Sequence, residues 1–242
     1  MIGIADSDGR AGTFYSTVDK ASALAYPYRM SLVDVYRACG LGSEPAAILW
    51  DMDGTITDTE SQWVAYSRQI IERRGGAWTQ EDEAALHGSS TEAHAEHLQY
   101  ILRRDGGEED EAMVLLKEVA DLMAERVYSD PDIMPGAIEL LDAFAEAGIP
   151  QALVTATPIH LVGPAIESLP KQYFAARVTG DEPFPGKPDP APYAAAMRRL
   201  DVAPGQCLAF EDSIPGATSA AGAGATVVNV MKTELSVLAA LL

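Results

Sequence analysis

The stretch AAILWDMDGT, residues 46–55, joins a short apolar run to two carboxylates. An apolar run of this length is typical of a buried strand. Side chains alternate along a strand, so Asp51 and Asp53 project to the same side if the extended geometry continues past Trp50. Two carboxylates that close repel each other, which is tolerable mainly when a cation lies between them or one of them holds a proton. An ordinary Asp-Gly turn with solvated acids is the alternative interpretation.

A calcium-binding loop would also explain two closely spaced acids followed by further oxygen-bearing side chains. The EF-hand pattern requires Gly at its sixth position and Glu at its twelfth. Counted from Asp51, these positions hold Ile56 and Gln62. The sequence therefore excludes an EF-hand here.

Three later segments supply further groups that suit phosphate chemistry. Residues 152–155 (ALVT) form a second apolar run that ends in a hydroxyl residue, and residues 186–190 (GKPDP) place one Lys in a turn. Residues 208–212 (LAFED) form a third apolar run that ends in two acids. Phosphoryl transfer needs a nucleophilic carboxylate, a proton carrier, hydroxyl and amide groups for the phosphate, a positive charge and acids that hold magnesium.

In these four segments the chain resembles the haloacid dehalogenase superfamily of phosphotransferases, in its phosphatase and beta-phosphoglucomutase-like branch. The motifs DMDGT, LVTAT, GKPDP and EDSIPG occur in the family's order, and the resemblance covers residues 46–230. It implies that Asp51 is the nucleophile, which forms an aspartyl-phosphate, and that Asp53 is the general acid and base.

The same resemblance implies how phosphate and metal are held. Thr155, the neighbouring Ala156 and Lys187 would bind the phosphate, and Lys187 would also stabilise the nucleophile. The implied cofactor is Mg²⁺. Its expected ligands are Asp51, the backbone carbonyl of Asp53, Glu211 and Asp212.

Composition limits the partners of this chain. Its 242 residues, 48% of them hydrophobic, suit one large domain or a domain with an insert. The net charge of −19 leaves no basic stripe for polymer phosphates, so nucleic acids and anionic membranes are excluded as partners. The expected partner is a small phosphorylated metabolite, bound by a monomer or weak homodimer.

The sequence also indicates a cytoplasmic location. No run reaches the roughly 18 apolar residues of a membrane span, and the N-terminus lacks the pattern of a secretion signal. Cys39 and Cys207 have no metal-ligand spacing. We expect both to be free thiols in a reducing compartment.

From residue 46 onward, strand-like and helix-like segments alternate. Such alternation predicts an α/β fold, a Rossmann-like, doubly wound parallel sheet. Ligands of such sheets bind beyond the carboxyl ends of the strands, where the acids and Thr155 fall. The expected strands are 46–50, 150–155, 175–179, 207–210 and 226–230, and the clearest helices are 136–147, 190–200 and 214–222.

The segment between residues 57 and 131 shows no good strand. It reads as amphipathic helices at 60–74, 92–104 and 108–127, separated by glycine-bearing turns. The resemblance implies that such an insert is a mobile helical cap that closes over the site. We therefore expect a cap domain at 58–130 and a core domain at 46–57 and 131–242. In the cap, Gly88 and Ser89 are the residues expected to reach substrate.

Residues 1–45 have no counterpart in the family's usual pattern. Residues 31–39 show helix-like apolar spacing. We interpret 1–45 as an N-terminal extension, either loosely packed or preceding a natural start at Met30.

The choice between a phosphatase and a mutase rests on positions where this chain differs from the family's mutases. Hexose-phosphate mutases typically carry a His where Trp63 stands, an Arg near Thr91, and a Lys-Asn pair where Pro158 and Ile159 stand. A mutase needs such cationic groups to hold the second phosphate of its bisphosphate intermediate. We therefore predict a magnesium-dependent phosphatase for a small phosphate monoester, such as that of a sugar or polyol. A hexose-phosphate mutase is the second candidate, and a non-catalytic binding protein on the same scaffold is the third.

Overall fold

A computed structural model describes residues 31–86, 89 and 91–242 of the chain. Within these residues, five parallel strands form one sheet with the order β3-β2-β1-β4-β5. The order reverses on either side of β1, as in a doubly wound sheet, so the predicted fold class is confirmed. The strands are β1 (Ala47–Trp50), β2 (Gln151–Val154), β3 (Phe174–Val178), β4 (Cys207–Glu211) and β5 (Thr226–Asn229).

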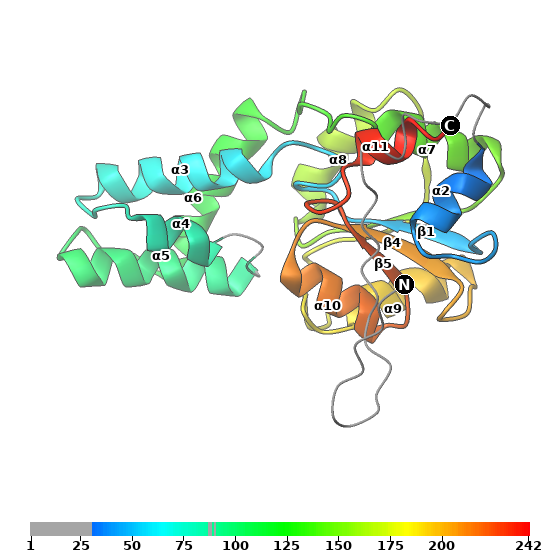
Figure 1. The fold of residues 1–242 in the computed structure, drawn as a ribbon. Coiled ribbons are helices and arrows are strands. Elements are labelled where there is room, and N and C mark those ends of the chain that lie inside the picture. Colours follow the sequence, from blue (N-terminus) through cyan, green and yellow to red (C-terminus); the bar gives the residue numbers. More distant parts are fainter. Residues whose placement is uncertain (1–30, 87–88, 90) are drawn as a thin grey trace.

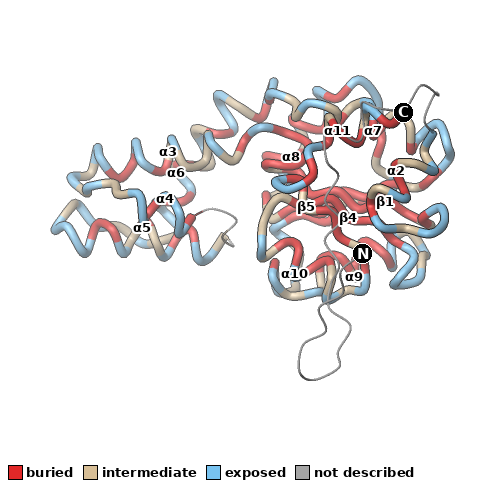
Figure 2. Tube along the Cα trace, viewed as in Figure 1, coloured by how far each residue is buried: buried red, intermediate tan, exposed pale blue. Residues whose placement is uncertain are grey.

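The central strands are buried on both faces because helices cover the sheet above and below (Figures 1 and 2). Side chains of β1 alternate between two apolar clusters: Ile48 and Trp50 belong to one, Ala47 and Leu49 to the other. Trp50 stacks on Phe210 of the neighbouring strand with ring centroids 4.3 Å apart. This continuous apolar run explains why the strands could be located from sequence.

Helices lie on both faces of the sheet (Figure 1). One face packs against α2 (Leu32–Ala38), α7 (Ala137–Glu146), α8 (Ile159–Glu167) and α11 (Leu235–Ala239). The other packs against α9 (Ala191–Leu200) and α10 (Ile214–Gly222). Of these six helices, α7, α9 and α10 match the clearest sequence predictions to within one residue.

A helical insert extends to one side of the sheet between β1 and α7 (Figure 1). Its described helices are α3 (Glu60–Arg73), α4 (Gln80–Leu86), α5 (Thr91–Asp105) and α6 (Ala112–Arg126). The three predicted helices are present, although α6 begins four residues later than expected. Among the residues that the structure describes, no helix is long and apolar enough to cross a membrane.

Helix α4 was not predicted, although the sequence contains its start signal. The backbone N–H of Thr79 donates to Asp82 Oδ2 at 3.0 Å, and the N–H of Asp82 donates back to Thr79 Oγ1 at 3.2 Å. This reciprocal pair is a capping box, formed by Thr and Asp three residues apart. The helix is only seven residues long, which hides it from a search for sustained periodicity.

Two adjacent chain segments connect the insert to the sheet. The N–H of Asp58 donates to the carbonyl of Asp132 at 2.8 Å, and the N–H of Met134 donates to the carbonyl of Ile56 at 2.9 Å. The outgoing and returning chains therefore run side by side. The division into domains at residues 58 and 130 stays a prediction.

Helix α2 confirms the helix predicted at 31–39. Val35 is fully buried, and Tyr36 stacks on Phe144 of α7 with ring centroids 6.4 Å apart. The described part of the extension is therefore packed into the core, contrary to loose packing, because its apolar stripe covers one face of the sheet. Met30 and the residues before it lie outside the described residues. Cys39 and Cys207 are buried free thiols, as expected.

Candidate active site

Three carboxylates meet at the carboxyl end of the sheet. Trp50 and Phe210 are in register, so the chains that follow β1 and β4 leave the sheet side by side. Side-chain oxygen atoms of Asp51, Glu211 and Asp212 lie within 4.8 Å of one another. Asp51 and Glu211 are buried. The fold thus brings together acids that are 160 positions apart in the sequence.

Two glycines make room for these acids. Gly54 has a φ of +79°, and a Cβ at this position would lie 2.3 Å from Oδ2 of Asp212. A Cβ at Gly216 would lie 2.0 Å from each carboxylate oxygen of Glu211. Any side chain at either position would displace an acid. The Gly of the DMDGT motif is therefore required by close packing as well as by its backbone conformation.

Lys187 offsets part of the negative charge. Its side chain is 8% exposed, and its Nζ donates at 2.5 Å to both Asp51 Oδ1 and Glu211 Oε1. Burial by itself lowers the pKa of an ammonium group, but the two carboxylates outweigh that effect and raise the pKa of Lys187. The lysine is therefore positively charged and fixed between two acids.

The cluster nevertheless has excess negative charge. Burial raises the pKa of Asp51; Lys187 opposes this effect, and the charges of Glu211 and Asp212 add to it. Burial, Glu211 and Glu60 raise the pKa of Asp212 to about 7. One lysine cannot balance three ionised acids. A divalent cation would stabilise their charged forms.

An unpartnered oxygen atom supports a metal site here. Oδ2 of Asp51 is buried and has no hydrogen-bond partner among the described residues. Buried polar atoms are normally paired, so an unpartnered oxygen atom in a group of carboxylates is suited to bind a cation. All the donors are oxygen atoms, which suits a hard cation such as Mg²⁺ or Ca²⁺ rather than a soft metal.

Asp53 lies in a different environment from Asp51. Its Oδ1 accepts hydrogen bonds from the hydroxyls of Thr59 at 2.5 Å and Tyr128 at 2.6 Å. Its Oδ2 accepts one from the hydroxyl of Thr157 at 2.6 Å. The hydroxyl of Thr155 also donates to Oδ2, at the longer distance of 3.5 Å. Hydroxyl donors thus hold this carboxylate in one orientation, and none of the four is a charged group.

Part of this support comes from the helical insert. Tyr128 follows α6 and is fully buried, and its hydroxyl accepts a hydrogen bond from Nε1 of Trp63 at 2.8 Å. Trp63 is the residue that stands where the mutases carry His. Here its indole N–H is linked to the general acid/base candidate, Asp53, through the hydroxyl of Tyr128.

The predicted phosphate-binding turn follows β2. The hydroxyl of Thr155 accepts a hydrogen bond from the N–H of Thr157 at 3.0 Å, which shapes the turn just before α8 begins at Ile159. The carbonyl of Ala156 accepts a hydrogen bond from the hydroxyl of Thr91 in α5 at 3.3 Å. The turn therefore contacts both the sheet and the insert, and it lies at a helix N-terminus, where anions are favoured.

A single cavity of about 650 Å³ connects the acids with the insert. Most of the predicted site residues line it: Asp51, Asp53, Ser89, Thr155, Ala156, Lys187 and Asp212. Glu211 does not line the cavity, because it lies beneath Lys187, where the hydroxyl of Tyr193 donates to it at 2.6 Å. Gly88 lies outside the described residues.

Sequence reasoning missed the hydroxyl residues that surround the acids. Thr157 carried a usable signal, since it stands two positions after Thr155 in the LVTAT motif and can share its face. Tyr128 and Tyr193 carried none, because an aromatic residue at helical spacing more often indicates the core. Their functional position depends on contacts between distant segments.

His94 and His97 of α5 have different partners. His94 is buried, and its Nε2 is hydrogen-bonded to the hydroxyl of Ser67 at 2.8 Å. Nε2 of His97 lies 3.1 Å from Oδ1 of Asp82. Burial, with a smaller effect of His97, lowers the pKa of His94 to about 4. His94 therefore lines the cavity as a neutral ring.

A family model described as haloacid dehalogenase-like hydrolase matches residues 45–224. This match spans the sheet, the acids and the insert. The chain therefore belongs to the haloacid dehalogenase-like hydrolases. Members of this family generally use a divalent metal ion, which agrees with the carboxylate group at the sheet end.

Curated relatives indicate which reaction this chain catalyses within the family. A phosphorylated carbohydrates phosphatase of Thermotoga maritima is 30% identical over 182 residues, which cover 74% of this chain and 81% of that protein. Hexitol phosphatase A of Escherichia coli is 29% identical over 188 residues, which cover 75% of this chain and 81% of that protein. These relatives place the chain in the phosphatase branch, as a phosphoric monoester hydrolase.

Solved structures agree with this fold. The crystal structure of CbbY from Rhodobacter sphaeroides in complex with phosphate is 28% identical and has a TM-score of 0.62. The similarity covers 76% of this chain and 84% of that one. The similar structure thus contains phosphate, the group that Thr155, Ala156 and Lys187 are expected to bind in this chain.

Proposed function

We propose that this chain is a magnesium-dependent phosphatase that hydrolyses a small phosphate monoester, such as that of a sugar or polyol, through an aspartyl-phosphate on Asp51. One observation carries the proposal: Asp51 lines the cavity with Oδ1 fixed by Lys187, and its Oδ2 has no hydrogen-bond donor among the described residues. Burial and the neighbouring acids raise the pKa of Asp51, so a bound divalent cation would be needed to keep this carboxylate ionised. A carboxylate that is positioned and incompletely paired is then suited to nucleophilic attack.

In the first step, a carboxylate oxygen of Asp51 forms a bond to phosphorus while the bond between phosphorus and the alcohol oxygen breaks. Asp53, as the carboxylic acid, gives its proton to that departing oxygen. The hydroxyls of Thr59, Tyr128 and Thr157 hold the Asp53 carboxylate in place for this transfer. The products are the free alcohol and a phosphorylated Asp51.

In the second step, a water molecule attacks the phosphorus of the aspartyl-phosphate. The carboxylate of Asp53 takes a proton from this water, and the bond between phosphorus and the Asp51 oxygen breaks. Inorganic phosphate leaves, and both aspartates return to their starting states. Asp53 therefore serves as acid and then as base.

The proposed metal ligands are Asp51, Glu211, Asp212 and the backbone carbonyl of Asp53. When bound, magnesium would supply positive charge to the phosphoryl oxygens. Lys187 adds a fixed positive charge on the same side of Asp51, and Thr155 with the backbone of Ala156 would orient the phosphate. Ser89, together with Gly88, would contact the alcohol part of the substrate.

The charges around the cavity favour a phosphatase over a mutase. Among the described residues that line it, Lys187 and Lys117 are the lysines, and no arginine is present. Lys117 is paired with Asp121 at 2.7 Å. The arginines of the insert that could hold a second phosphate pair with acids elsewhere: Arg103 with Glu109, Arg104 with Asp82 and Asp105, and Arg126 with Glu125.

We further propose that residues 46–57 and 131–242 form the core domain and residues 58–130 a cap that closes over the site. The adjacent connecting segments at Asp58 and Asp132 support this division, because two neighbouring crossings can act as one hinge. Residues 1–45 would form the extension. A monomer or weak homodimer and a cytoplasmic location stay predictions.

Metal removal tests the proposal. Exhaustive chelation should reduce phosphate release from p-nitrophenyl phosphate by at least about a hundredfold, and magnesium should restore it. Magnesium alone should also raise the melting temperature of the wild-type protein, but not of an Asp212→Asn variant, because a cation that binds the folded state stabilises it. Full activity after chelation would contradict the mechanism, and the absence of phosphate release with any monoester would indicate a non-catalytic protein.

A further inference from the structure

The insert side of the cavity differs in chemistry from the sheet side. Apolar side chains from three helices line it, and we call them the apolar wall: Trp63 and Val64 of α3, Leu86 of α4, and Met113, Leu116 and Ala120 of α6. Leu86 and Leu116 are nearly fully buried, whereas Met113 is 55% exposed. The wall therefore contains buried side chains, which are held by packing, and exposed side chains, which a bound substrate could cover.

Charged groups beside the wall are neutralised locally. Lys117 and Asp121 both line the cavity, and Lys117 Nζ lies 2.9 Å and 2.7 Å from the two carboxylate oxygens of Asp121. His94 is neutral and is hydrogen-bonded to Ser67. Glu60 belongs to the opposite end of the cavity, since its charge acts on Asp212.

In the part of the chain that the structure describes, two of the neutral polar groups beside the wall have partners, and one does not. Nε1 of Trp63 donates to Tyr128, and the hydroxyl of Thr91 donates to the carbonyl of Ala156. The hydroxyl of Ser89 is buried without a hydrogen-bond partner among the described residues. The described part of the wall thus offers a substrate one uncommitted hydroxyl beside a broad hydrocarbon surface.

A free hexose phosphate fits this environment poorly. Each sugar hydroxyl that leaves water needs a hydrogen-bond partner in the site, and hydroxyls buried against hydrocarbon are penalised. Apolar groups gain from the same contact. The volume of about 650 Å³ exceeds what a phosphoryl group needs and lies within the range of pockets for small organic ligands.

We infer that the alcohol part of the substrate carries a hydrocarbon face, such as a carbocyclic ring or branched chain, which packs on the apolar wall while one polar group reaches Ser89. This inference rests on the proposed phosphatase function. It narrows the chemical class of the leaving group within that function: among small phosphate monoesters, those of an alcohol with one apolar side are preferred to those of a fully hydroxylated sugar.

A matched pair of substrates tests the inference. Cyclohexylmethyl phosphate and glucose 6-phosphate both carry the phosphate on a CH₂ group attached to a six-membered ring, and they differ mainly in the ring hydroxyls. We expect kcat/KM with magnesium to be at least about tenfold higher for cyclohexylmethyl phosphate. A preference below about threefold, or for glucose 6-phosphate, would overturn the inference while leaving the phosphatase function in place. Failure to hydrolyse either ester or p-nitrophenyl phosphate would refute the proposed function itself.

A pair of variants on one helix locates the effect. Met113→Gln places a polar group in the wall at an exposed position, and we expect it to reduce the preference for cyclohexylmethyl phosphate about threefold or more. Val114→Gln is the control, because Val114 is 39% exposed on the same helix and does not line the cavity. It should leave the preference unchanged. An unchanged preference in Met113→Gln, or an equal change in both variants, would show that the wall does not contact the substrate.

Discussion

The two ends of the cavity differ in chemistry: charged groups lie at the sheet end and apolar groups at the insert end. At the sheet end, Asp51, Lys187 and Glu211 form a charged cluster in which Lys187 donates to both acids. At the insert end, apolar side chains of α3, α4 and α6 face the same space. Phosphoryl transfer needs fixed charges, whereas the choice of an alcohol needs shape and hydrocarbon contact. The difference indicates that chemistry and substrate selection are carried by separate parts of the chain.

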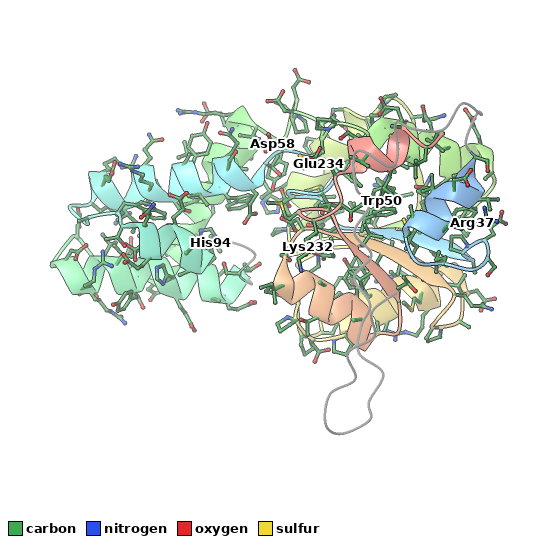
Figure 3. The ribbon with its side chains drawn as sticks, in the orientation of Figure 1. Arg37, Trp50, Asp58, His94, Lys232 and Glu234 are labelled. Carbon is green, nitrogen blue, oxygen red and sulfur yellow. The ribbon has the colours of Figure 1, made fainter. Side chains whose placement is uncertain are left out.

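Asp51→Asn at the sheet end should have the largest effect on activity. It removes the nucleophile while keeping side-chain volume, so we expect kcat to fall at least about a thousandfold. Asp58→Asn is a matched control, because Asp58 is exposed at the junction with the insert (Figure 3) and makes the same change of charge. Its rate of phosphate release should remain near that of the wild type. A loss of less than tenfold in Asp51→Asn would mean that the phosphoryl group is never attached to this residue.

Tyr128→Phe tests whether the insert acts on the chemistry of the sheet end. The change removes a hydroxyl that donates to Asp53 and accepts from Trp63, so proton transfer to the departing oxygen should become less efficient. We expect kcat to fall about tenfold for an alkyl phosphate and less for p-nitrophenyl phosphate, whose leaving group needs little protonation. Equal losses for both substrates would indicate a purely structural role.

A matched control for Tyr128→Phe is Tyr173→Phe. The hydroxyl of Tyr173 donates to Asp142 at 2.7 Å, and neither residue lines the cavity. This variant should leave both rates unchanged. Thermal unfolding of the two variants would show whether either has lost stability.

The smallest effect concerns the insert end and appears in stability rather than rate. The structure gives His94 a pKa of about 4, caused mainly by burial, whereas an unfolded His titrates near 6.5. Between these values the unfolded chain binds more protons, so stability falls as pH decreases from about 6.5 to about 4. Between pH 7 and pH 5, this residue should reduce the free energy of unfolding by about 2 kcal/mol.

Urea unfolding of the wild type and of His94→Gln, at pH 7 and pH 5, measures this contribution. The variant keeps a hydrogen-bonding group for Ser67 but cannot titrate, so it should lose about 2 kcal/mol less than the wild type over this range. The same pH dependence in both proteins would contradict a buried, neutral His94. Figure 3 shows His94 among the helices of the insert, apart from the strands, so the measurement reports on that region.

The central strands of the sheet were predictable because they are buried on both faces. Each of the five expected strands appears within a residue or so of its predicted bounds, since a short, mostly apolar run between turns is typical of a strand in a parallel sheet. Helix α4 was missed because one capping box and seven residues give too little periodicity. Helix α11 is shorter still, at five residues. Within the insert, local sequence therefore determined the long helices better than the short one.

The sequence by itself determined the candidate reacting groups of this protein. Asp51 and Asp53 follow β1, and Lys187, Glu211 and Asp212 come from two other motifs, so their types and order indicated phosphoryl transfer before any contact was known. These residues could be identified because the chemistry needs particular groups at the ends of particular strands.

Only the tertiary structure decided what surrounds those groups. Tyr128 and Thr157 donate hydrogen bonds to Asp53 although they lie 75 and 104 positions away in the sequence. No local sequence pattern predicts such contacts. The apolar wall likewise combines side chains from three helices: α3 and α6 have the sequence of ordinary amphipathic helices, and α4 is too short to show a periodicity. Hydrogen bonds and packing act between neighbours in space, so these features arise only when the insert folds against the sheet.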